Sequence, residues 1–235
     1  MAIDFRLLTY EKITNYLWMI SAEGTADHYR VSADKLPALS SDEKDTFAAI
    51  GVYQDMKWTQ LHPLNASKSD TMGKFHISMH DDDLPKAWNA VVTLIAHAGV
   101  KAKVASAWTA KYHRERSTDA IGKNIVIYFD KTQSQDKEKY EKLLTDIERE
   151  FEKAGIRPGP AIKGEKPVAG SRYSYMRYGD TIYSVHTGEA VNASNSAVTT
   201  ALDDIVIPPA AGKWAELRPP SGQGQDKLNP TSQVR

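Results

Sequence analysis

The middle of the chain alternates short segments of β-strand character with two longer segments of helical periodicity. The strand-like segments, in which polar and apolar residues alternate or β-branched and aromatic residues cluster, cover residues 74–79, 100–106, 124–129 and 171–178. Apolar residues at helical spacing occupy 82–99 and 137–154, and these two segments end at Gly99 and Gly155. Because several neighbours look like hairpin partners, we predict an α+β fold with helices packed on a mostly antiparallel sheet.

The first of these helices has a recognisable start. Asp82 or Asp83 can cap it, and Pro85 stands in its first turn. The run of His80 and three aspartates (81–83) also suggests a metal site, but four adjacent side chains cannot all point at one ion. Helix capping is the better interpretation, and we predict no metal-binding residues.

The two ends of the chain differ from the middle. Residues 208–235 are rich in proline, glycine and polar residues, and such a segment cannot bury enough apolar surface to offset its chain entropy. Residues 10–20 look helical and apolar. We therefore predict a partly helical N-terminal cover that controls substrate access (1–68), a single compact core (69–207) and a disordered C-terminal tail (208–235).

The composition excludes several classes of protein. The 235 residues contain 30 Lys and Arg and 30 Asp and Glu, so no overall charge favours nucleic acid or a membrane surface. The absence of cysteine excludes a thiolate nucleophile, a disulfide framework and a cysteine–metal site. The start of the chain lacks a signal-peptide pattern, and the apolar stretch at 91–100 is too short to span a bilayer. We expect a soluble protein.

Basic residues recur at alternate positions of the strand-like segments. Lys74 and His76 share one face of the first such segment, and Lys101 and Lys103 share one face of the next. One interpretation is a solvent-facing sheet edge. The other is an anion site without obligatory carboxylate ligands, which would suit a dianionic phosphate. The further members of such a site would be Arg114, Arg116, Tyr128 and Arg177.

Two common catalytic patterns are absent from the sequence. No glycine-rich loop followed by Lys-Ser or Lys-Thr occurs, which argues against nucleotide hydrolysis of the P-loop kind. No G-x-S-x-G motif occurs either, which argues against a serine hydrolase of the α/β type.

Four short motifs in a fixed order resemble the phosphothreonine lyase family. They are GKFHIS (73–78), KAKV (101–104), GKNIVIY (122–128) and MRYG (176–179). The family includes bacterial effectors that inactivate host MAP kinases and the lyase components of lanthipeptide synthetases. KFHIS resembles the effector version, whereas GPAIKGEKP, MRYG and the segment 110–128 resemble the lanthipeptide version. The resemblance covers roughly residues 73–183 and implies a lyase core without a cofactor. It also implies a bacterial protein, either secreted into a host cell as an effector or cytoplasmic.

The resemblance also implies roles for individual residues. Lys103 would be the general base, His76 the general acid, and Lys74 would stabilise charge on the substrate carbonyl. Arg116 or Arg114, together with Arg177, would hold the phosphate. The remaining residues that it places at the phosphate or the substrate are Tyr128, Glu165, Lys166 and Lys123.

One position departs from the effector pattern. The effectors carry a further phosphate-binding arginine where this chain has residues 181–186, which include no arginine. Lys166, Arg172 or Lys123 are the candidates to supply that charge.

The implied activity is β-elimination of phosphate from phosphothreonine or phosphoserine, which leaves a dehydroamino acid. The substrate would be a phosphorylated protein, such as the activation loop of a host MAP kinase, although residues 1–30 lack a convincing docking segment. The alternative is a stand-alone lyase of lanthipeptide dehydration that works with a separate kinase. A phosphopeptide-binding module without turnover, and an unrelated α+β protein with accidental motif matches, are the remaining alternatives.

Overall fold

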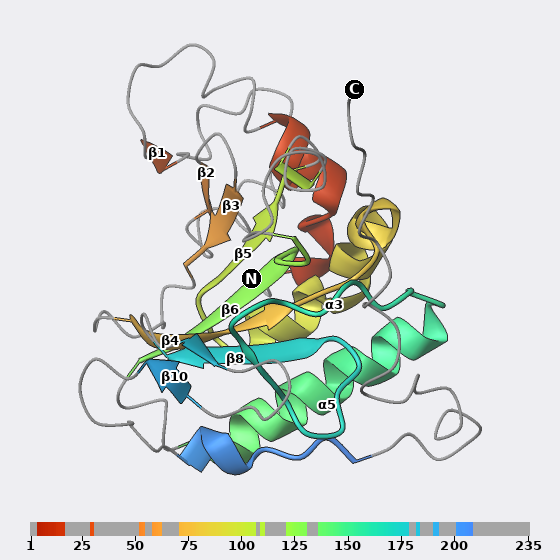
Figure 1. The fold of residues 1–235 in the computed structure, drawn as a ribbon. Coiled ribbons are helices and arrows are strands. Elements are labelled where there is room, and N and C mark those ends of the chain that lie inside the picture. Colours follow the sequence, from red (N-terminus) through yellow and green to blue (C-terminus); the bar gives the residue numbers. More distant parts are fainter. Residues whose placement is uncertain are drawn as a thin grey trace, which may run out of the picture.

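The computed structural model of the chain describes residues 4–16, 29–30, 52–54, 58–62, 71–106, 109–110, 121–130, 136–178, 182–183, 190–192 and 201–208. Within them, an eight-stranded antiparallel sheet forms the centre of the molecule (Figure 1). A separate pair is formed by β9 (Ile182–Tyr183) and β10 (Ala190–Asn192). The spatial order of the large sheet is β1 (Tyr29–Arg30), β2 (Val52–Gln54), β3 (Trp58–Leu61), β5 (Ala102–Ala105), β6 (Ile125–Asp130), β4 (Thr71–Ile77), β8 (Ser174–Tyr178) and β7 (Lys166–Pro167).

Two long helices lie side by side against the sheet, α3 (Leu84–His97) and α5 (Lys137–Lys153) (Figure 1). The α3 helix connects β4 to β5, and the α5 helix follows β6. Shorter helical segments are η1 (Phe5–Leu7), the π-helix η2 (Lys12–Tyr16), η4 (Asp81–Asp83) and η6 (Ala201–Asp204).

The core lies between the sheet and the two helices. Phe75 of β4 packs against Phe129 of β6 and Tyr140 of α5, with ring centroids 5.3 and 5.6 Å apart. Trp88 of α3 is fully buried, and its indole N–H donates to the backbone oxygen of Leu8. Each large apolar side chain buried in this way contributes roughly 1.5–3 kcal/mol. Phe75 and Ile77 of β4 therefore face the helices, and Lys74 and His76 face away.

The predicted α+β fold with a mostly antiparallel sheet is confirmed. The helices predicted at 82–99 and 137–154 correspond to α3 and α5, and Gly99 and Gly155 have φ of 62° and 63° beyond their ends. The four strand predictions correspond to β4, β5, β6 and β8.

The interpretation of β4 as a solvent-facing edge is wrong. The strand lies between β6 and β8, and its His76 side chain is buried. β4 is therefore an internal strand, and other segments partly cover its polar face.

The start of α3 differs from the prediction in its chemistry. Asp83 stands at the N-cap position, but its side chain makes no capping hydrogen bond. Its carboxylate instead accepts hydrogen bonds from the backbone N–H and the guanidinium of Arg157, at 2.9 Å each. Asp81 accepts a hydrogen bond from Asn124. These carboxylates tie the start of the helix to neighbouring loops.

The first third of the chain contributes strands as well as helical turns. β3 pairs along its whole length with β5, and β2 pairs with β3. The sheet thus continues from the predicted core into residues of the predicted N-terminal cover. The division into three segments stays a prediction, and most of the predicted disordered tail (209–235) lies outside the described residues.

Among the described helices, none is long and apolar enough to cross a membrane.

Candidate active site

The sheet face turned away from α3 and α5 carries the polar residues that the motifs single out. Lys74 of β4 pairs directly with Tyr128 of β6 on one side and with Arg177 of β8 on the other. Directly paired residues of antiparallel strands project to the same face. Lys74, Tyr128 and Arg177 therefore form one row across three adjacent strands. All three side chains are partly exposed.

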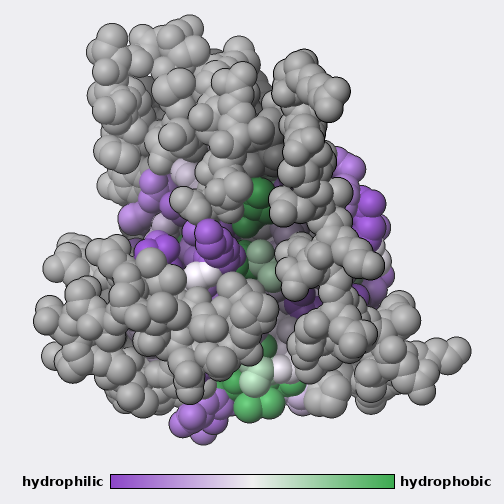
Figure 2. Space-filling view, viewed as in Figure 1, coloured by the Kyte–Doolittle hydropathy of each residue, from purple (hydrophilic) through white to green (hydrophobic). Residues whose placement is uncertain are grey.

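The next row contains the proposed acid and base. His76 of β4 and Lys103 of β5 both pair with Val126 of β6, so these two side chains project from the same face, two strands apart. On its other side, His76 pairs with Tyr175 of β8. The fold thus gathers Lys74, His76, Lys103, Tyr128 and Arg177 from four neighbouring strands. Figure 2 shows hydrophilic residues of the described part near the centre of the face in view, beside hydrophobic ones.

Aromatic rings flank the Lys103 ammonium. Its Nζ lies 4.2 Å from the centroid of the Trp58 ring and 5.7 Å from that of Tyr128. Trp58 belongs to β3, whose Gln60 pairs with Lys103. A cation over an aromatic face is stabilised by about 0.5–2 kcal/mol. Trp58 could not be predicted as part of the site from the sequence, because nothing local relates it to a lysine on another strand.

His76 is held by a buried carboxylate. Its Nδ1 lies 2.6 Å from Oε2 of Glu165, and the two residues are 4% and 0% exposed. The other carboxylate oxygen, Oε1, lies 3.3 Å from Nζ of Lys123. In the part of the chain that the structure describes, the His76 ring makes no second hydrogen bond.

The environment sets the protonation states of this pair. Burial lowers the pKa of His76, and the nearby Lys123 and Lys74 charges add to this, whereas the hydrogen bond to Glu165 opposes it. Burial alone would raise the pKa of Glu165, but the hydrogen bond from His76 and the charge of Lys123 outweigh it, so that pKa is lowered. At neutral pH the pair therefore consists of a neutral imidazole and an ionised carboxylate.

The segment between α5 and β7 closes one end of this face. Ser78, one row beyond His76, donates a hydrogen bond to the backbone oxygen of Pro160. A Cβ atom on Gly122 would lie 2.6 Å from the Ser78 hydroxyl and 3.0 Å from the Pro160 oxygen, and Gly122 has a φ of 80°. Glycine at position 122 thus leaves room for the segment between α5 and β7 to lie on the sheet. The same segment delivers Glu165 to His76.

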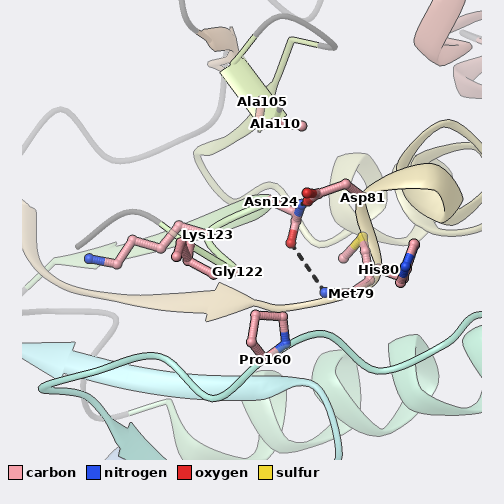
Figure 3. Close-up of a pocket in the computed structure, with 10 residues that line it drawn as sticks. Met79, His80, Asp81, Ala105, Ala110, Gly122, Lys123, Asn124 and Pro160 are labelled. Carbon is pink, nitrogen blue, oxygen red and sulfur yellow. Dashed lines mark hydrogen bonds between the residues drawn. The ribbon is translucent and has the colours of Figure 1, made fainter. Parts of the chain in front are cut away.

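A cavity of about 210 Å³ adjoins this closed end (Figure 3). Within it, the Asn124 side chain accepts a hydrogen bond from the Met79 backbone, and the Lys123 side chain extends away from the other labelled residues (Figure 3). Lys123 is the single member that the cavity lining shares with the predicted site. The lining residues are Met79, His80, Asp81, Ala105, Ala110, Ile121, Gly122, Lys123, Asn124 and Pro160.

The structure does not bring every predicted residue to this face. Lys166 pairs with Met176, whose side chain is in the core, so the register directs Lys166 to the opposite face. Arg172 lies 3.9 Å from Glu152 of α5, again on the helix side of the sheet. Arg172 and Lys166 are therefore poorly placed to replace the missing arginine. Arg114 and Arg116 lie outside the described residues.

The arrangement places two cationic side chains beside an imidazole and a further amine. Lys74 and Arg177 provide charge-assisted donors beside the His76 ring. Lys103 provides an amine that can take up a proton once it is neutral. These are the groups needed for an elimination from a phosphate ester.

The fold and this face define an α+β protein whose central strands carry lysine, arginine and a buried histidine–carboxylate pair. The chain belongs to the family described as "RamC, N-terminal domain", whose model matches residues 40–208. A comparison with curated proteins found no match.

Among solved structures, the chain is similar to several phosphothreonine lyases. The VirA (SpvC) effector of Chromobacterium violaceum is 18% identical, with 55% of this chain and 65% of that one covered and a TM-score of 0.47. The SpvC protein of Salmonella is 16% identical, with 73% and 86% covered and a TM-score of 0.49. OspF of Shigella flexneri is 15% identical, with 72% and 90% covered and a TM-score of 0.48. The match thus spans just under two thirds of VirA. VirA and OspF are both described as phosphothreonine lyases, the family that the motifs resemble.

Proposed function

We propose that the protein is a phosphothreonine and phosphoserine lyase that removes phosphate by β-elimination. The observation that carries the proposal is the placement of Lys103 and His76 on one sheet face, two strands apart, beside the row of Lys74, Tyr128 and Arg177. The resemblance of the motifs supports the same assignment.

In the proposed reaction, Lys103 Nζ takes the α-proton of the phosphorylated residue. The electron pair of that C–H bond forms the double bond between Cα and Cβ, and the Cβ–O bond breaks. The departing phosphate oxygen takes a proton from His76. The products are a dehydroamino acid, hydrogen phosphate, a protonated Lys103 and a neutral His76, so that protons and charge balance. Both protons are transferred by side chains, and the scheme requires no metal or cofactor.

The α-proton of a peptide is a weak acid, so charge that develops on the neighbouring carbonyl oxygen needs stabilisation. Lys74 projects from the same face, next to His76 along β4, and is our candidate for this role. Arg177, which pairs with Lys74, is our candidate for binding the phosphate. Arg114 or Arg116 would be a second phosphate ligand, as the resemblance implies.

His76 must be protonated when the phosphate leaves, although burial keeps it neutral in the free protein. A phosphate monoester has a second pKa of about 6, so near neutral pH part of it still carries a proton. Binding of the anion favours the charged imidazole, which supplies the acid when the substrate is in place.

The substrate is a phosphorylated peptide segment, and two sources deserve a direct comparison. The KFHIS motif supports a phosphoprotein such as a host MAP kinase. The GPAIKGEKP and MRYG motifs support a lanthipeptide precursor. The family match also supports the lanthipeptide precursor as substrate. Its description names the N-terminal domain of a longer protein, and a lyase that is joined to a kinase in one synthetase would be such a domain. We therefore favour the lanthipeptide precursor.

The test is to incubate the protein with two peptides and measure the released phosphate and the dehydroamino acid, the latter trapped with a thiol. One peptide is a doubly phosphorylated MAP kinase activation loop, and the other a phosphorylated lanthipeptide precursor. Faster elimination from the precursor supports our choice, and faster elimination from the kinase peptide overturns it. Tight binding of both peptides without any thiol adduct contradicts the lyase proposal and leaves a phosphopeptide-binding module.

A further inference from the structure

The residues behind His76 form a connected, buried set of charges. His76 Nδ1 lies 2.6 Å from Glu165 Oε2, and Lys123 Nζ lies 3.3 Å from Glu165 Oε1. We propose that Glu165 and Lys123 are positioning residues that act through His76 and do not bind the substrate. This inference rests on the proposed lyase function, since it assigns His76 the role of the acid.

Glu165 determines which ring nitrogen of His76 is available for proton transfer to the substrate. An ionised carboxylate only accepts hydrogen bonds, so Nδ1 of His76 must carry a proton and donate it to Glu165. In the neutral ring, Nε2 then has the free electron pair. It is the single nitrogen that can pick up a proton and deliver it to the leaving phosphate oxygen. The carboxylate thereby fixes both the tautomer and the plane of the ring.

The burial of Glu165 argues against contact with substrate. Its side chain is 0% exposed, and a carboxylate beside a phosphate dianion would repel it. Its second oxygen has no hydrogen-bond partner of good geometry among the described residues, and the 3.3 Å contact with Lys123 supplies its compensating charge. A buried carboxylate without such a partner is costly and tends to take up a proton.

Lys123 is occupied by this contact. Lys123 stands two residues before β6. Its side chain is 16% exposed and ends at the Glu165 carboxylate. The Lys123–Glu165 pair has no net charge, so it leaves the positive charge of the phosphate-binding face unchanged. It keeps Glu165 ionised without neutralising the cations that would hold the substrate.

The other groups around His76 do not duplicate this role. Tyr175 stands directly opposite on β8, and burial raises the pKa of its phenol, so it stays neutral. Lys74 lies along the same strand, and its charge disfavours a protonated ring. On the β6 side, the partner Val126 is apolar. Glu165 is thus the group that orients the ring.

The test compares two leaving groups on otherwise identical peptides. The first peptide carries phosphothreonine, whose leaving phosphate needs a proton. The second carries the methyl ester of that phosphate, which leaves as a much weaker base and needs no acid. With phosphothreonine, we expect Glu165→Gln to lower kcat by up to roughly 10⁴-fold, the effect of replacing the carboxylate partner of a catalytic histidine by an amide in other enzymes. With the methyl ester, we expect a change of only a few fold, and KM should change little with either peptide.

Lys123→Met should show the same dependence on the leaving group, because Glu165 becomes easier to protonate without the lysine. The loss in kcat should be smaller than in Glu165→Gln. Lys163→Met is the matched control, because Lys163 lies on the same segment as Glu165 and is exposed. A raised KM with unchanged kcat in either variant would assign that residue to substrate binding and overturn the inference. An equal loss with both leaving groups would also overturn it.

A second measurement does not depend on turnover. In ¹⁵N NMR spectra of the histidine side chains of the wild-type protein, His76 should be in the Nδ1–H tautomer above its pKa. An Nε2–H tautomer contradicts the inference, even if Glu165→Gln fails to fold. Failure of the wild type to eliminate from either peptide would instead contradict the proposed function, and the tautomer would still report on the role of Glu165.

Discussion

The imidazole of His76 and the carboxylate of Glu165 are 2.6 Å apart and buried, although 89 residues separate them in the chain. The contact joins β4 to the segment that closes the end of the polar sheet face. It therefore links the stability of the fold to the protonation of a residue in the site.

This link predicts a dependence of stability on pH. The pKa of His76 is lowered below its ordinary value of 6.5, so the unfolded chain binds more protons than the folded one as pH falls below 6.5. The free energy of unfolding should therefore decrease as pH falls from 6.5 toward the folded-state pKa. The lowered pKa of Glu165 adds a further loss of stability that begins only below its ordinary value of 4.5. Urea denaturation at a series of pH values measures both effects.

His76→Asn is the comparison for that experiment. The variant lacks the titrating ring, so its stability should change less between neutral pH and the window in which Glu165 titrates. An equally steep loss in both proteins would show that other groups cause it.

Replacement of the proposed base should abolish turnover and spare binding. Lys103→Met removes the amine but keeps a side chain of similar length over the Trp58 ring. A well-placed base contributes on the order of 10²–10⁴-fold, so we expect the rate of elimination to fall by about that factor. Lys86→Met, at an exposed position of α3, is the control and should keep full activity. Single-turnover elimination and phosphopeptide binding, measured together, check the prediction. Wild-type rates in the Lys103 variant would remove this residue from the mechanism.

Trp58 should affect the pH at which Lys103 becomes neutral. The ring stabilises the protonated amine through the 4.2 Å contact, by about 0.5–2 kcal/mol. In Trp58→Leu, the ascending limb of the rate–pH profile should therefore move to lower pH. Trp58→Phe keeps part of the aromatic face and should move it less. A limb that stays in place, or that moves to higher pH, contradicts this role.

A buried carboxylate outside the site should matter for stability alone. Glu148 of α5 accepts a hydrogen bond from the Ser171 hydroxyl and from the backbone N–H groups of Arg172 and Tyr173, the latter two at 2.8 and 3.3 Å. Glu148→Ala leaves these donors without their acceptor and should lower the free energy of unfolding by about 1–3 kcal/mol. Glu138→Ala, the same change at an exposed position of the same helix, should cost less than about 1 kcal/mol. Urea denaturation checks this, and equal effects would contradict it.

The elements of the central sheet could be predicted from the sequence because their signals are local. Alternation in 74–79 and the apolar run in 124–129 indicate strands, and Gly99 and Gly155 mark helix ends whatever the tertiary structure. Placing Lys74 and His76 on one face follows from the same period of two.

The remaining features of the site depend on tertiary contacts. The partner of His76 comes from a loop whose path is set by its contacts with Ser78 and not by any periodicity. Lys166 is adjacent to Glu165 in sequence, yet the strand geometry of β7 directs it to the opposite face. Trp58 reaches Lys103 only because β3 pairs with β5. Each of these relationships depends on the path of a loop or on strand pairing, which motif spacing does not encode.

The most direct test of the lyase proposal is a mass measurement on a phosphothreonine peptide incubated with the protein in EDTA and ¹⁸O-labelled water. We expect a peptide lighter by one phosphoric acid and released phosphate without ¹⁸O, because elimination breaks the Cβ–O bond and adds no water. A peptide lighter only by the elements of HPO₃, with ¹⁸O in the phosphate, would mean hydrolysis at phosphorus and would contradict the mechanism proposed for Lys103 and His76.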